Sequence, residues 1–175
     1  MLRERFWQGK RVLVTGHTGF KGGWLSKVLL NCGAEISGIS LEPASSPNLF
    51  ESLGLKNSVR NHFFDIRDFG KVKEALKKEK PEIVFHLAAQ PLVRESYEDP
   101  LNTFGTNIIG TANILQAIKE TDTVRSAVII TTDKVYEEYP SREYKEEDKL
   151  GGHDPYSSSK AAARRTPIRF MKPPT

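Results

Sequence analysis

The chain has 175 residues, of which 38% are hydrophobic and 27% charged, so its length and composition suit one globular domain with a buried core. No apolar stretch is long enough for a membrane span, and no apolar run precedes a cleavage site near the first residues, so we expect neither a membrane segment nor a signal peptide. The net charge of +4 comes from residues 164–175, whose four basic residues leave 22 basic and 22 acidic residues elsewhere, which argues against nucleic-acid binding.

The chain contains a single cysteine, Cys32, which cannot form an internal disulfide. It falls in an apolar helical pattern, where core packing is favoured over thiol chemistry. With no leader expected, these features predict a cytoplasmic protein. No metal site is predicted.

The amino-terminal third of the sequence alternates between strand and helix patterns. Residues 10–15 form a β-branched run that ends in glycine, which is typical of a buried strand. Residues 20–31 predict a helix, and residues 34–40 a second strand. Residues 41–56 hold two prolines and three serines, which predicts a loop with room for one helical turn. The apolar face of the helix is expected to comprise Trp24, Leu25, Val28 and Leu29.

The same alternation continues through the rest of the chain. The further elements expected are strands over 62–66, 82–88 and 124–132, helices over 68–80 and 100–120, a polar loop over 134–154 and a helix from Tyr156. Asp68 and Asp99 are expected to cap the helices that follow them. Strands that alternate with helices predict an α/β fold, a doubly wound parallel sheet of Rossmann type, with its ligand crevice beyond the carboxyl ends of the strands.

A glycine-rich turn, Thr15–Gly22, joins the first expected strand to the first helix. Gly16 permits the tight turn, Gly19 lets the backbone approach a pyrophosphate, and Gly22 allows the helix to pack closely. The helix N-terminus adds N–H groups and partial positive charge, so the turn predicts a dinucleotide site, although its spacing is G-x-x-G-x-x-G instead of G-x-G-x-x-G. His17 in this turn is expected either to touch a phosphate or to be solvated.

The ends of the second and third strands carry residues expected to meet the adenosine of a dinucleotide. An acid at the end of the second strand favours NAD, but Ser40 stands there, with Glu42 two residues later. No arginine stands nearby to take a 2′-phosphate, so we predict NAD. Asp65 and Ile66 are expected to contact adenine, with a local cap that binds no ligand as the alternative.

The fourth strand ends in His86–Gln90, where small residues would let a cofactor lie against the sheet. His86 itself is expected to be a packed, hydrogen-bonded core residue. Leu87, Ala88 and Ala89 are therefore predicted to contact the cofactor.

Tyr156 and Lys160 lie one helical turn apart and so project from one face of the last helix. A lysine ammonium beside a phenol favours the phenolate and lowers the tyrosine pKa from its ordinary value of about 10. The phenolate can then accept a hydroxyl proton while hydride leaves the same carbon for nicotinamide, whose ribose lysine can bind. This spacing is also common on solvated helices, but the Gly16 turn and the strand end Thr132–Lys134 favour catalysis.

These motifs resemble the extended short-chain dehydrogenase/reductase superfamily over residues 9 to about 163. The motifs that carry the resemblance are Thr15-Gly16-x-x-Gly19-Phe20-x-Gly22, Asp65-Ile66, His86-Leu87-Ala88-Ala89-Gln90, Asn107-Ile108-Ile109-Gly110-Thr111 and Tyr156-x-x-x-Lys160. The residues expected to bind NAD are Gly16, His17, Thr18, Gly19, Phe20, Gly22, Ser40, Asp65, Ile66, Leu87, Ala88, Ala89, Tyr156 and Lys160.

Within the superfamily, the glycine turn followed by Gly23-Trp24-Leu25, and the strand end Thr132-Asp133-Lys134, resemble nucleotide-sugar 4,6-dehydratases that act on CDP-glucose. The resemblance implies oxidation at C4, loss of water across C5–C6 and hydride return to C6. The product would be CDP-4-keto-6-deoxyglucose, a precursor of deoxysugars in surface polysaccharides.

The resemblance also assigns roles to the five catalytic candidates. Thr132 would hold the 4-hydroxyl and Tyr156 would take its proton. Asp133 would protonate the departing 6-hydroxyl, and Lys134 would assist deprotonation at C5, with its pKa depressed by burial beside Lys160 or Tyr156. The alternative is a solvated Lys134 with no part in the reaction.

The predicted organisation is a partial NAD-binding domain over residues 9–163 and an atypical basic tail over 164–175, with no substrate domain. Truncation is therefore expected to impair turnover. The alternatives are an epimerase of the same superfamily, or a cofactor-binding fragment that is not catalytic. The sequence leaves the oligomeric state open.

Overall fold

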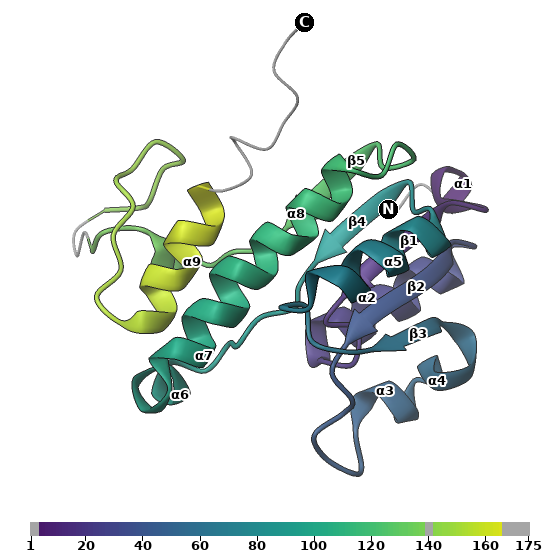
Figure 1. Cartoon of the computed structure of the whole chain (residues 1–175), viewed down its shortest axis with the longest axis horizontal. Coiled ribbons are helices and arrows are strands. Elements are labelled where there is room, and N and C mark those ends of the chain that lie inside the picture. Colours follow the sequence, from purple (N-terminus) through teal and green to yellow (C-terminus); the bar gives the residue numbers. More distant parts are fainter. Residues whose placement is uncertain (1–3, 139–141, 166–175) are drawn as a thin grey trace, which may run out of the picture.

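A computed structural model describes residues 4–138 and 142–165, and Figure 1 shows their arrangement. The strands are β1 (Arg11–Thr15), β2 (Glu35–Ser40), β3 (Arg60–Phe63), β4 (Ile83–His86) and β5 (Ser126–Ile129). The helices are α1 (Glu4–Trp7), α2 (Phe20–Asn31), α3 (Leu49–Ser52), α4 (Leu55–Ser58), α5 (Phe69–Glu79), α6 (Val93–Glu98), α7 (Pro100–Phe104), α8 (Thr111–Lys119) and α9 (Pro155–Arg165), with a π-helical segment (Gly105–Gly110) and a 3-10 turn (Asp133–Val135). None of these helices is long and apolar enough to cross a membrane.

The five described strands form one parallel sheet in the order β3-β2-β1-β4-β5. The order reverses direction between β1 and β4, which places the topological switch point beside the glycine turn. Helices lie on both faces of the sheet (Figure 1). The doubly wound, Rossmann-type fold expected from the sequence is confirmed.

The core divides into two clusters because successive strand residues point to opposite faces. Val12 and Val14 of β1 pack on the face covered by α2, α3 and α4, where Leu29 and Phe50 join them. Leu13, between the two valines, packs on the face covered by α5 and α8. The sheet is therefore buried on both sides in its central strands.

The face that α2 turns toward the protein differs from the expected one. Its buried residues are Gly22, Gly23, Ser26 and Leu29. Trp24 and Val28, expected in the core, are 46% and 38% exposed. The reason is that the helix lies so close to the glycine turn that only small residues have room on that side. The predicted apolar face is therefore confirmed for Leu29 and for the partly buried Leu25, and was wrong for Trp24 and Val28.

The predicted long helix after Asp99 is present but is not a uniform α-helix. Asp99 caps its start by accepting a hydrogen bond from the Asn102 N–H at 2.9 Å, as expected. The π-helical segment then interrupts it before α8. Gly110 lies so close to the Ile66 side chain that a Cβ there would overlap it, which shows how tightly this segment meets the loop after β3.

Other boundaries shifted where side chains turn the chain locally. The third strand was predicted over 62–66, but β3 ends at Phe63, because the Asp65 carboxylate accepts from the Arg67 N–H at 2.8 Å and bends the backbone. The loop expected over 41–56 contains α3, and α4 begins at Leu55. Helices α1 and α6 were not predicted.

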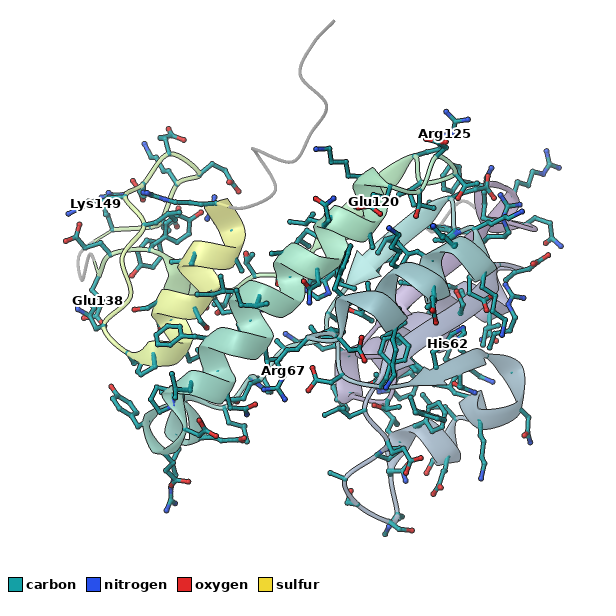
Figure 2. The ribbon with its side chains drawn as sticks, viewed as in Figure 1. His62, Arg67, Glu120, Arg125, Glu138 and Lys149 are labelled. Carbon is teal, nitrogen blue, oxygen red and sulfur yellow. The ribbon has the colours of Figure 1, made fainter. Side chains whose placement is uncertain are left out.

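Helix α9 packs against α7, the π-helical segment and the 3-10 turn, and the segment between β5 and α9 lies beyond it (Figure 1). Arg164 joins α9 to that segment, with its guanidinium over the Tyr136 ring and a 2.6 Å ion pair to Glu146. Figure 2 shows Lys149 and Glu138 in this segment, at the opposite end of the molecule from His62 on β3.

Two neighbouring glycines of α2 give a matched test of this packing. A Cβ on Gly22 would overlap the Gly16 carbonyl, whereas a Cβ on Gly23 would meet its nearest atom, Leu49 Cδ2, at 3.4 Å. We expect Gly22→Ala to lower the free energy of unfolding by about 2 kcal/mol or more, through overpacking against backbone that cannot yield. Gly23→Ala should leave it unchanged or raise it by up to about 1 kcal/mol. Urea unfolding measures both, and equal stability of the two variants would contradict the close approach.

Candidate functional site

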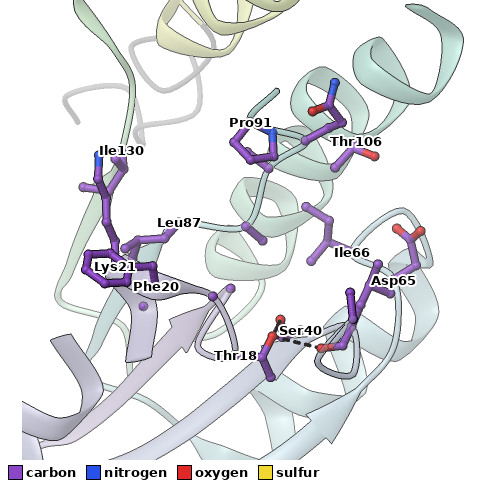
Figure 3. A pocket seen from close by; sticks show the side chains of 18 of the residues that line it. Thr18, Phe20, Lys21, Ser40, Asp65, Ile66, Leu87, Pro91, Thr106 and Ile130 are labelled. Carbon is purple, nitrogen blue, oxygen red and sulfur yellow. Dashed lines mark hydrogen bonds between the residues drawn. The ribbon is translucent and has the colours of Figure 1, made fainter. Parts of the chain in front are cut away.

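A pocket of about 700 Å³ opens at the carboxyl edge of the sheet, above the switch point (Figure 3). The glycine turn, the ends of β2 and β4, the loop after β3 and helix α9 all contribute to its walls. Of the predicted cofactor residues, those that line it are Gly16, Thr18, Gly19, Phe20, Gly22, Ser40, Asp65, Ile66, Leu87, Ala88, Ala89, Tyr156 and Lys160.

The glycine turn is held against the end of β4. Gly16 has a φ of 75°, a left-handed conformation, and a Cβ there would lie 2.8 Å from the Ala88 nitrogen. The Gly16 N–H donates to the Ile39 carbonyl at 2.8 Å, which fixes the turn to β2 as well. Gly19 is the N-cap of α2 and supplies no side-chain acceptor, so the helix N-terminus faces the pocket without a competing cap.

His17 takes neither of the positions expected for it. Its side chain is fully buried, and its Nε2 lies 2.9 Å from Asn61 Oδ1. The ring packs edge-on against Phe50 and stacks near Phe63 at a centroid distance of 6.1 Å. Burial lowers the pKa of His17. The side chain therefore anchors the turn to the interior and is not one of the residues that line the pocket.

A buried hydrogen-bond network positions the end of β4, and it fixes the tautomer of His86. Thr111 Oγ1 donates to the Asn107 carbonyl, so it must accept from His86 Nε2 at 3.0 Å. His86 Nδ1 is then the acceptor for Thr15 Oγ1 at 2.7 Å. Thr15 Oγ1 in turn accepts from the Leu87 and Ala88 N–H groups at 3.1 and 3.0 Å.

The network confirms His86 as the packed, hydrogen-bonded core residue that the sequence predicted, and shows in addition that it is neutral. The imidazole is 2% exposed, and burial, with repulsion from Lys160, lowers its pKa to about 3. Its function is structural, since it ties β1, β4 and the long helix together beneath the pocket.

The loop after β3 forms the wall near the expected adenine position. Asp65 pairs with Arg67, and the hydrogen bond from the Arg67 side chain lowers the pKa of the Asp65 carboxyl. Arg67 also donates to Asn102 Oδ1 of α7 at 3.0 Å, and Figure 2 shows it between the long helix and the sheet. The role of Asp65 toward adenine stays a prediction.

At the opposite end, α9 brings Tyr156 and Lys160 to the pocket. Lys160 Nζ donates to the Ile130 carbonyl at 3.0 Å, and burial, with repulsion from Lys21, lowers its pKa to about 8. Burial raises the pKa of Tyr156, a hydrogen bond with Thr132 opposes this, and Asp133 adds to the rise. The lowered tyrosine pKa expected from the sequence is therefore wrong for this structure, because the ammonium is held by Ile130 while the phenol is desolvated.

The strand end Thr132–Lys134 lies next to the pocket without lining it. Thr132 Oγ1 donates to Asp133 Oδ1 at 2.9 Å, and this bond lowers the pKa of the Asp133 carboxyl. Asp133 and Lys134 are exposed in the 3-10 turn, whereas Ile130 and Thr131 before them line the pocket. The structure thus brings Tyr156 and Lys160 to the glycine turn but leaves Asp133 and Lys134 at the rim. The burial of Lys134 expected from the sequence is therefore wrong, because the 3-10 turn exposes its side chain.

Asn107 is a supporting residue whose function the sequence did not reveal. Its side chain accepts from the Gln90 N–H at 2.9 Å and donates to the Gln90 carbonyl at 3.1 Å. It also donates to Ser159 Oγ on α9 at 2.8 Å, and Ser159 bonds the Tyr156 carbonyl. The signal was its place in the Asn107–Thr111 motif, between Gly105 and Gly110, yet only the fold shows what it holds.

Lys21, Arg67, Gln90, Ile130 and Thr131 also line the pocket and were not predicted. Lys21 could have been found, because it lies inside the glycine turn. The others reach the pocket only through tertiary packing.

A parallel sheet with a glycine turn at its switch point and a Tyr–Lys pair over the same pocket defines a Rossmann-type dinucleotide-binding protein. The model of the family described as GDP-mannose 4,6 dehydratase matches residues 13–172, and the chain belongs to this family. The match extends beyond Ala163, where the recognised motifs end.

Several known proteins are similar to the chain. CDP-glucose 4,6-dehydratase from Salmonella typhimurium is 48% identical over 93% of the chain and 46% of that enzyme. CDP-paratose 2-epimerase from Salmonella typhi is 30% identical over 87% of the chain and 50% of that enzyme. The structure of UDP-glucose 4-epimerase from Thermus thermophilus, a complex with NAD, has a TM-score of 0.80 at 30% identity, over 91% of the chain and 50% of the epimerase. The chain spans about half the length of these relatives.

The neutral state of His86 predicts how stability depends on pH. The unfolded chain binds a proton near pH 6.5, whereas folded His86 does so only near pH 3. Its contribution is therefore complete above pH 6.5 and is lost as pH falls below that value, by about 2 kcal/mol at pH 5. Urea unfolding at pH values from 7 to 5 gives the free energy of unfolding at each pH. This free energy should fall less with pH in His86→Gln than in the natural chain, whereas the exposed variant His153→Gln should show the same fall as the natural chain. Equal slopes for all three would contradict the assignment.

Asn107 gives a second prediction, on the support of α9. Asn107→Ala removes the partners of the buried Gln90 N–H and of Ser159. We expect the free energy of unfolding to fall by about 2–4 kcal/mol, because unpaired buried groups cost more than the bonds themselves contribute. The control Asn31→Ala, at an exposed position, should change it by less than about 0.5 kcal/mol. A loss at Asn107 no larger than in the control would show that the network does not stabilise the fold.

Proposed function

We propose that the chain is the cofactor-binding part of an NAD-dependent nucleotide-sugar 4,6-dehydratase, with CDP-glucose as its substrate. The observation that carries the proposal is that Tyr156 and Lys160 line the same pocket as the glycine turn. The 48% identity to a CDP-glucose 4,6-dehydratase supports the substrate class. Because the chain spans about half of that relative, the activity is proposed for the whole enzyme of which this sequence would form the amino-terminal half.

The residues present suit NAD. The glycine turn brings the start of α2 to the pocket, where the first N–H groups of the helix can meet a pyrophosphate, with Lys21 among the lining residues. Leu87, Ala88 and Ala89 offer small or apolar surface for the length of a dinucleotide. When bound, nicotinamide accepts the C4 hydride and later returns it to C6.

The chain's own groups would handle the protons. Tyr156 would take the proton of the sugar 4-hydroxyl, and Thr132 would orient that hydroxyl. Water would then leave across C5–C6 as Lys134 removes the C5 proton and Asp133 protonates the departing 6-hydroxyl. The hydride removed from C4 is returned to C6, so the cofactor is not consumed. The net change is the loss of one water to give the 4-keto-6-deoxy sugar.

The protonation states of Tyr156 and Lys160 in this structure mean that Tyr156 would have to lose its proton before it could act as the base. The raised pKa of Tyr156 keeps its phenol protonated at neutral pH. Lys160, with a pKa of about 8, is mostly charged at pH 7 and lies one turn along the same helix. If its ammonium left the Ile130 carbonyl for the phenol, the pKa of Tyr156 would fall, which is what a base at this position requires.

An epimerase of the same family is the second candidate, supported by the likeness to CDP-paratose 2-epimerase and to solved epimerases. The pair Asp133–Lys134 favours the dehydratase, because epimerisation at C4 needs no groups for loss of water. As a dehydratase, the enzyme would supply deoxysugar precursors for surface polysaccharides and would act in the cytoplasm.

The proposal is tested with the chain fused to the remaining half of the Salmonella typhimurium relative and supplied with NAD and CDP-glucose. We expect a base-labile 4-keto sugar from the fusion and little turnover from the chain by itself, because positioning of the substrate contributes several kcal/mol to catalysis. Tyr156→Phe in the fusion should lower kcat by about 10²–10⁴. The exposed Tyr97→Phe is the control. An unaffected Tyr156→Phe variant, or conversion of CDP-glucose to an epimer, would overturn the assignment.

A further inference from the structure

The end of β2 lacks the carboxylate that usually selects NAD in this fold, and a hydrogen-bonded hydroxyl group occupies its position. Ser40 occupies the position, is 7% exposed and lines the pocket. Its Oγ lies 2.6 Å from Thr18 Oγ1 of the glycine turn, the contact drawn dashed in Figure 3. Glu42, the nearest acid in sequence, is not among the lining residues.

The direction of the hydrogen bonds in this pair follows from its third partner. Thr18 Oγ1 lies 3.0 Å from the Leu41 carbonyl, which can only accept, so the single hydroxyl proton of Thr18 is used there. The short contact between the two hydroxyls therefore needs the proton of Ser40. Ser40 is left with lone pairs only, and any ligand that meets it must donate a hydrogen bond.

One of the cations that line the pocket, Arg67, is already engaged. Arg67 donates to the Asp65 carboxylate and to Asn102 Oδ1, and it lies in the loop after the neighbouring strand β3. Among the described lining residues at this end of the pocket, the positive charge is thus neutralised by Asp65. Lys21, which also lines the pocket, lies away from Ser40 in Figure 3. A 2′-phosphate beside Ser40 would therefore meet acceptor lone pairs, whereas a 2′-hydroxyl can donate to Ser40.

We propose that the Ser40–Thr18 hydroxyl pair is the specificity determinant for the cofactor, selecting a free ribose 2′-hydroxyl by the polarity of a hydrogen bond instead of by the charge of a carboxylate. The inference rests on the proposed binding of NAD and goes beyond it in naming what rejects NADP. Because a neutral acceptor repels a phosphate less than a carboxylate does, discrimination is moderate, with NAD bound about 10- to 100-fold more tightly than NADP.

Two substitutions are expected to change the ratio of the Kd for NADP to the Kd for NAD in opposite directions. Thr18→Val removes the acceptor that holds the Ser40 proton, so Ser40 can donate to a phosphate, and the NADP/NAD ratio of Kd should fall about tenfold. Ser40→Asp adds a negative charge, and the ratio should rise about tenfold or more. Thr123→Val is the matched control, because its hydroxyl donates to the Pro81 carbonyl outside the pocket.

Calorimetric titration of the full chain and the three variants with NAD and with NADP measures the ratios, and thermal melts establish that each variant is folded. A ratio unchanged within about threefold by both Thr18→Val and Ser40→Asp would overturn the proposal while NAD binding stands. A natural chain that binds both dinucleotides equally would also overturn it. If neither binds the natural chain, the proposed function itself fails, and the inference with it.

Discussion

The close approach of the Gly16 and Ala88 backbones positions the glycine turn against the end of β4 at the carboxyl edge of the sheet. Gly16 adopts a φ of 75° and leaves no room for a Cβ beside the Ala88 nitrogen. Thr15 secures the same approach from below, since its hydroxyl donates to His86 and accepts from Leu87 and Ala88. The buried imidazole of His86 thus supports the wall of the pocket without lining it. Both ring nitrogens of His86 are hydrogen-bonded, which offsets the cost of burying a polar group this deep.

The support for the other wall is built on the same principle, from a buried amide. Asn107 pairs with both backbone groups of Gln90 and reaches Ser159 on the helix that carries Tyr156. The π-helical segment around it gives the helix an extra residue where the amide must turn inward. Two interior side chains, His86 and Asn107, therefore hold the turn and the helix that share the pocket.

The sequence predicted what depends on local pattern. The caps at Asp68 and Asp99 and the place of the glycine turn follow from periodicity and turn chemistry. It could not predict that α2 would bury glycines and expose Trp24, because that depends on how near the helix lies to Gly16. The inward orientation of the His17 side chain likewise depends on tertiary packing. Gly38 makes room for its ring, because a Cβ added at this position would overlap the imidazole. Gly38 lies in β2, far from His17 in the sequence.

The same limit applies to the charges. A Tyr–Lys spacing of one turn suggests an ammonium beside a phenol, but the fold sends Lys160 to the Ile130 carbonyl and lowers its pKa to about 8, partly through Lys21. Two cations that repel each other and the start of α2 therefore face one pocket. A bound diphosphate would offset the repulsion between Lys21 and Lys160 and raise the pKa of Lys160. In the proposed reaction, a bound cofactor would therefore increase the fraction of Lys160 that is charged beside Tyr156.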